Sequence, residues 1–208
     1  MLTDGARPII VAVGSFMLVV CAFVVTPLPI IPFSLHPLPM TLFGSLGVLS
    51  TALMRFPKTP MMKNPATGAF FSRKEAEKRH AIAQTFALIC ASTGLMAIYL
   101  SKESGNKPHL TTWHSWLGAL GAFVYLLAAL AGYAGYMGWV KGARRWHRKL
   151  NKPAAGAAFV ALVSSLWSSF AEGKGAVGNR FGILMGISSI IFVAAFGPKI
   201  DNLPGKSA

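Results

Sequence analysis

Four of the five histidines stand at or near the leading ends of successive long apolar segments, and they are the residues of this chain best suited to chemistry. His36, His80, His114 and His147 follow one another at similar intervals along the chain. Ionisable side chains at membrane depth are costly and commonly mark functional sites. Because imidazole is a common ligand of transition metals, the recurrence predicts that these residues hold a metal or a haem.

The segments that carry the histidines are typical of an integral membrane protein. The chain has 208 residues, of which 53% are hydrophobic and only 12% are charged, a composition that excludes an ordinary soluble domain. Runs long enough to cross a hydrocarbon core of about 30 Å cover residues 8–26, 33–54, 81–100, 113–140, 153–171 and 181–197. The sequence therefore predicts an all-α protein of six helices, forming one membrane domain over residues 1–208.

Basic residues gather on one side of this predicted topology. Most of the 20 lysines and arginines fall in the N-terminal segment, in loops 55–79 and 141–152 and in the tail, which together form side A. By the positive-inside rule, side A and both termini are cytoplasmic. The same rule accounts for the net charge of +14, and without a basic domain outside the helices no nucleic-acid partner is expected.

Helix direction sorts the four histidines into two pairs. Successive helices alternate in direction, so His36 and His114 start from side B, while His80 and His147 start from side A. Facing side chains in a four-helix bundle are a common setting for cofactors. Two imidazoles on one haem iron leave no open position for oxygen, which favours electron transfer over gas binding.

Small residues follow these histidines on the same helix faces and favour a flat, bulky ligand, although they equally suit helix packing. They are Ala83, Ala87, Gly118, Gly121 and Ala154. A zinc site lacks a complete set of nearby ligands, since Glu77 is the only acidic residue close to a histidine of either pair. No Cys-x-x-Cys-His sequence is present, so the predicted haems are non-covalent, b-type groups.

Two local sequences resemble signatures of the eukaryotic cytochrome b-561 family. Residues 34–40 read SLHPLPM and residues 112–118 read TWHSWLG, similar to the family's His-Pro-x-x-Met and His-Ser-Trp-x-Gly patterns. The resemblance covers residues 33–170, flanked by the helices 8–26 and 181–197. It implies two haem b groups, one held by His36 and His114 and the other by His80 and His147, the same pairing that topology gives.

The resemblance also implies an activity: cytoplasmic ascorbate donates electrons that cross the membrane to monodehydroascorbate or a ferric chelate. It further implies a possible pairing of chains as homodimers. Two alternatives stay open. One is a haem-free channel or transporter in which the histidines relay protons, and the other is a di-haem reductase fed by a flavoprotein or a quinol.

Several further residues are candidates for contact with substrates or electrons. Lys78 and Arg79 precede His80 and create a positive mouth suited to an anion such as ascorbate, although the positive-inside rule and haem propionates also account for them. His109 is not an axial ligand, because its offset from His114 places it on a different face of a helix; it is expected at the acceptor side or as a solvated loop residue. Phe43, Phe86 and Tyr125 are aromatic residues that would lie between the haems or simply pack the core.

Overall fold

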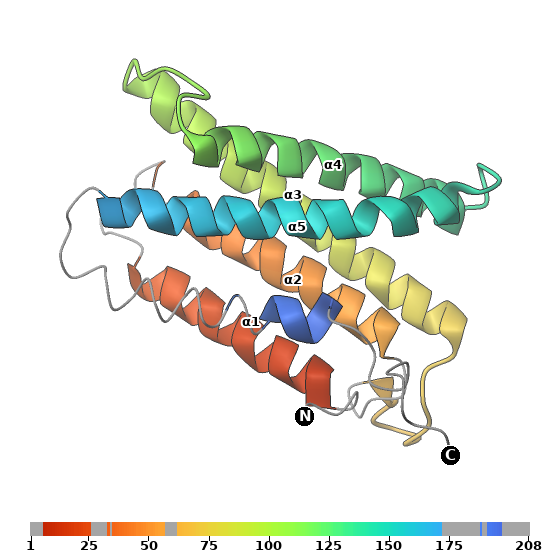
Figure 1. Cartoon of the computed structure of the whole chain (residues 1–208). Coiled ribbons are helices and arrows are strands. Elements are labelled where there is room, and N and C mark those ends of the chain that lie inside the picture. Colours follow the sequence, from red (N-terminus) through yellow and green to blue (C-terminus); the bar gives the residue numbers. More distant parts are fainter. Residues whose placement is uncertain are drawn as a thin grey trace, which may run out of the picture.

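The computed structural model describes residues 6–25, 33, 35–56, 62–171, 188 and 191–196. Within these residues, five long helices run side by side with alternating direction (Figure 1): α1 Ala6–Val25, α2 Pro37–Arg55, α3 Arg73–Ser104, α4 Trp113–Tyr136 and α5 Ala143–Ala171. By length and composition, three helices of the described residues, α2, α3 and α4, are able to cross a membrane. The predicted all-α class is confirmed for the described part of the chain.

Two helices begin much earlier than their apolar runs. The apolar runs begin at residues 81 and 153, whereas α3 begins at Arg73 and α5 at Ala143. Ser72 caps α3, its hydroxyl accepting a hydrogen bond from the backbone N–H of Glu75 at 3.2 Å. Hydropathy marks the part of a helix that suits hydrocarbon, while the charged first turns extend beyond it. As a result His80 and His147 lie inside their helices.

The helices that carry His36 and His114 begin at the histidines themselves. Pro37 opens α2 with His36 as its N-cap residue, and the His36 side chain makes no capping hydrogen bond. Thr112 and Ser115 form a reciprocal capping box at the start of α4. These two histidines therefore lie at the opposite end of the bundle from the starts of α3 and α5 (Figure 1).

The four central helices form two antiparallel hairpins. α2 packs closely on α3, and α4 packs closely on α5, whereas α3 and α4 meet over a small area; α1 covers α2. Residues 191–196 are helical and pack with Val11 of α1 and Ala52 of α2. The remainder of the predicted helix 181–197, apart from residue 188, lies outside the described residues.

The contact between α4 and α5 depends on small residues. Gly121 of α4 is buried, and a Cβ atom added there would lie 3.3 Å from Ala157 Cβ of α5. At Gly156 of α5, by contrast, an added Cβ atom would have no heavy atom within 4 Å. The two glycines therefore differ in whether a side chain fits.

We expect Gly121→Val to lower the free energy of unfolding by about 1 to 3 kcal/mol, the usual cost of overpacking. Thermal unfolding in detergent, followed by circular dichroism, measures the change. Gly156→Val is the matched control, because it introduces the same side chain into the same helix pair without a clash. Equal melting temperatures for the two variants would contradict this account of the α4–α5 contact.

Candidate functional site

The structure brings His36 and His114 together. Their ring centroids are 6.2 Å apart and the ring planes are nearly perpendicular, at 81°. His36 precedes the first turn of α2, and His114 is the second residue of α4. One imidazole therefore comes from each hairpin.

His80 and His147 form an equivalent pair near the other end of the bundle. Their ring centroids are 6.0 Å apart, with 72° between the planes. His80 comes from α3 and His147 from α5, so this pair also joins the two hairpins. We refer to the two as the 36/114 pair and the 80/147 pair.

Backbone carbonyls hold three of the four rings from behind. His36 Nδ1 lies 2.9 Å from Gly94 O, His114 Nδ1 2.9 Å from Ala161 O, and His147 Nδ1 2.8 Å from Ala128 O. A carbonyl only accepts hydrogen bonds, so each Nδ1 carries a proton, and in the neutral imidazole this tautomer leaves the lone pair on Nε2. Such a bond is how proteins commonly orient a metal-binding histidine.

The spacing within each pair suits one metal ion between two nitrogens. Two metal–imidazole bonds of about 2 Å each, together with the rings, separate ring centroids by roughly 6 Å. Among the described residues, no group of three or more His, Cys, Asp or Glu side chains lies close enough to hold a metal ion. The residues present therefore fit a group that brings its own equatorial ligands, as a haem does, better than a bare ion.

The small residues near the histidines divide into two kinds. Gly118, one turn beyond His114, has no heavy atom within 4 Å of an ideal Cβ position. Ala87 packs in a cluster with Phe43, and Ala154 is 3% exposed. Gly118 therefore leaves room beside the 36/114 pair, whereas Ala87, Ala154 and Gly121 serve helix packing.

A polar and aromatic layer separates the two pairs. The Phe43 and Tyr125 rings meet edge to face, with centroids 4.7 Å apart, and the Tyr125 hydroxyl donates to Gln84 Oε1. Phe86, in contrast, is 58% exposed on the outer surface of α3. The expectation that Phe43 and Tyr125 lie inside the core is confirmed, and the same expectation for Phe86 is wrong.

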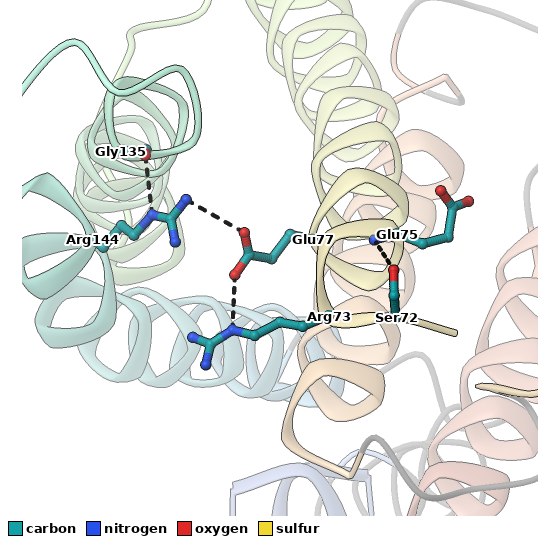
Figure 2. A network of polar contacts seen from close by, with 6 residues as sticks. All are labelled: Ser72, Arg73, Glu75, Glu77, Gly135 and Arg144. Carbon is teal, nitrogen blue, oxygen red and sulfur yellow. Dashed lines mark hydrogen bonds and ion pairs between the residues drawn. The ribbon is translucent and has the colours of Figure 1, made fainter. Parts of the chain in front are cut away.

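An acidic residue ties α3 to α5 one turn from the 80/147 pair. Glu77 accepts a hydrogen bond from Arg73 Nε at 3.1 Å and lies 3.5 Å from Arg144 Nη2, while Arg144 Nε donates to Gly135 O at 3.1 Å. Figure 2 shows Glu77 between the two arginines. Arg144 is thus engaged in a link between helices, which the sequence did not reveal.

The two basic residues before His80 have different surroundings. Arg79 Nε pairs with Glu75 Oε1 at 3.0 Å, and its guanidinium lies 3.9 Å from the Phe71 ring centroid. Lys78 is exposed, and within the described part of the chain its ammonium group forms no hydrogen bond or ion pair. Lys78 is therefore the more available cation of the two.

His109 lies in the loop between α3 and α4. Its Nε2 is 2.8 Å from Glu103 Oε1, and its ring stacks on Tyr99 with centroids 5.0 Å apart. Both partners belong to the last turns of α3. The structure thus holds His109 against the end of α3.

The paired histidines agree with what comparison of the sequence with known families finds. Residues 35–172 match the model of the family described as eukaryotic cytochrome b561. The chain belongs to this family. Cytochromes of the b type carry haem b, so membership implies haem b binding, and together with the apolar helices it makes the chain an integral membrane protein.

Similar proteins include transmembrane reductases of mammals. The human probable transmembrane reductase CYB561D1 is 37% identical over 87 residues, which are 42% of this chain and 35% of the relative. The bovine transmembrane reductase CYB561D2 is 35% identical over 86 residues, 41% of this chain and 36% of the relative. The matched part thus spans about a third of the length of these curated relatives.

Sequence reasoning overlooked the close approach of Gly132 to His147 of the cytochrome. A Cβ atom at Gly132 of α4 would lie 2.9 Å from His147 Nδ1 and 3.1 Å from His147 Cε1. Only a residue without a side chain leaves the ring where it is, bonded to Ala128 O. Gly132 lies near the end of the apolar segment that precedes His147. A glycine at that place is the sequence signal that would have indicated the close approach.

We expect Gly132→Ala to displace the His147 ring and weaken haem binding at one site by at least about tenfold, in line with disturbed support of a metal-binding histidine. Titration of haem into apoprotein, read by the Soret band, gives the affinities. Gly156→Ala is the control, because its position is open. An unchanged haem affinity in Gly132→Ala would contradict this account, because haem binding would then not depend on the present position of the His147 ring.

Proposed function

We propose that this cytochrome b561 carries electrons across the membrane through two haem b groups, each held by two histidines. Cytoplasmic ascorbate is the donor, and monodehydroascorbate or a ferric chelate on the opposite side is the acceptor. The observation that carries the proposal is the presence of two opposed imidazole pairs, with centroids 6.2 and 6.0 Å apart, at opposite ends of one bundle. The homodimer stays a prediction.

The assignment of ligands follows from the pairs. His36 and His114 hold one haem, and His80 and His147 hold the other. A haem iron bound by two imidazoles exchanges single electrons and has no open position for oxygen. The chain's part is to fix the rings through their Nδ1 bonds and to keep water out with the layer around Phe43 and Tyr125.

The distance between the sites suits a relay through the membrane. On α3, His80 contributes to one pair, while the Gly94 carbonyl holds His36 of the other. The helix rises about 21 Å from His80 to Gly94, at about 1.5 Å per residue. The two pairs are therefore separated by a large part of a hydrocarbon core of about 30 Å.

Charge supports the proposed direction of flow. The starts of α3 and α5 are rich in lysine and arginine, which favours a cytoplasmic position for the 80/147 pair. Lys78 is exposed there and directly precedes Arg79 and His80, and we assign it to the attraction of ascorbate. Arg79 is assigned to shaping the same mouth, and His109, held by Glu103, to the acceptor side.

We expect His36→Ala and His114→Ala each to lose the same haem, and His80→Ala and His147→Ala each to lose the other. Haem per chain should fall by about half in each variant, because an imidazole is lost from one iron. Haem quantification and reduced-minus-oxidised spectra check this expectation. Loss of the same spectral species in His36→Ala and His80→Ala would contradict the pairing.

The activity is tested with purified protein in vesicles that contain ferricyanide, with ascorbate added outside. We expect the haem spectrum to become reduced at once and the trapped ferricyanide to be consumed. Lys78→Gln should lower the rate several-fold at subsaturating ascorbate, and Lys102→Gln, at the other end of α3, is the charge-matched control. Equal rates in the two variants would remove Lys78 from the donor site.

The same experiment separates the alternatives. A protein that binds no haem would refute the proposal and favour the channel or transporter. A protein with two haems that ascorbate leaves oxidised, but a quinol or a flavoprotein reduces, would keep the haem sites and overturn the donor.

A further inference from the structure

The histidines share one regular relation to the carbonyls that hold them. His36 is held by Gly94, which follows His80 on α3 by about four helical turns. His147 is held by Ala128 of α4, and Ala128 follows His114 by the same interval. His114 is in turn held by Ala161 of α5, and Ala161 follows His147 by this interval as well. In each case the carbonyl belongs to the partner helix within the same hairpin.

The regularity points to Ser50 as the acceptor for the fourth histidine. Ser50 follows His36 by the same interval, on α2, the hairpin partner of α3. His80 Nδ1 is buried and has no hydrogen-bond partner among the described residues, while Ser50 Oγ lies 2.8 Å from Nε2 of Gln84, which is one turn beyond His80 on α3. A helical carbonyl has a second lone pair for such a bond.

Ser50 is itself fixed by a glutamine. Gln84 Nε2 donates to Ser50 Oγ at 2.8 Å and to Gly47 O at 3.3 Å. Gln84 is one turn beyond His80 on the same face of α3. The network therefore joins Gln84 to Ser50 across the α2–α3 contact, one turn from His80.

The network continues into the other hairpin. The Tyr125 hydroxyl of α4 donates to Gln84 Oε1, so that both ends of the Gln84 amide are used. Polar side chains within a membrane bundle are expensive unless they are paired. Gln84, Tyr125 and Ser50 satisfy one another, and helix packing alone would not require a glutamine at this depth.

We propose that Gln84 is a positioning residue for the 80/147 pair, holding Ser50 so that its carbonyl oxygen accepts a hydrogen bond from His80 Nδ1. The proposal rests on the assignment of His80 and His147 as ligands of one haem. Gln84 does not touch the iron; it acts through Ser50 and His80. Tyr125 supports Gln84 from α4.

The bond has a measurable consequence for the haem. An Nδ1–H that donates to a carbonyl makes the imidazole more basic, which stabilises the oxidised iron and lowers its reduction potential. Loss of Gln84 frees Ser50 and weakens the bond, so the potential of this one haem should rise. A residue that only packs helices would change stability without a selective shift in potential.

The test is a spectroscopic redox titration of the full-length holoprotein with Gln84→Met, which keeps a similar length without the amide. The species that disappears in His80→Ala identifies the affected haem. We expect its ratio of reduced to oxidised forms at a fixed potential to rise about tenfold, equivalent to about 59 mV for one electron. The other haem should keep its midpoint.

Thr93→Val is the matched control, because it removes a hydroxyl from the same helix. Within the described part of the chain, that hydroxyl bonds only to Ile89 O, at 2.9 Å. If Gln84→Met fails to fold, Tyr125→Phe removes one hydroxyl from the same network and should give a smaller shift in the same direction. Equal shifts of both haems, or no shift in either variant, would overturn the role of Gln84. A wild-type protein without two haems would instead overturn the proposed function.

Discussion

The need to satisfy an imidazole N–H inside a membrane bundle constrains the rest of this structure. Water is scarce there, so the proton on Nδ1 needs a protein acceptor, while Nε2 must stay free. Three of the rings use a backbone carbonyl of the adjacent helix. Because that carbonyl already serves its own helix, the two helices have to approach closely, and the residues at the contact have to be small.

This requirement explains why the bundle is built from two hairpins. Each of these three histidines is held by the partner helix of its own hairpin, and every histidine of the two pairs faces one from the other hairpin. Neither hairpin can therefore form either pair alone. The contact within each hairpin is extensive and α3 meets α4 only sparsely, so the hairpins behave as two supports with the imidazoles between them.

The sequence predicted the parts of this arrangement that follow from periodicity and direction. Alternating helices were enough to pair His36 with His114 and His80 with His147, and the structure brings these residues together. Hydropathy does not give the start of α3, because it measures suitability for hydrocarbon, whereas Ser72 and the charged turn after it decide where that helix begins. Gly132, Gln84 and the link from Glu77 to Arg144 were missed because they depend on which helices touch. A small residue at one constant interval after each histidine was a readable signal, carried by Ser50, Gly94, Ala128 and Ala161.

The spacing of the hairpins couples packing to chemistry. In the proposed haem sites, an imidazole pair would hold an iron only while its centroids stay roughly 6 Å apart, since metal–nitrogen bonds are about 2 Å long. The hairpins are joined between the pairs by Tyr125 and Gln84 and at one end by Glu77 and Arg144. The ion pair is partly exposed, so water weakens it, whereas the Tyr125 bond is sheltered. The central layer is therefore the stronger determinant of the distance on which both sites depend.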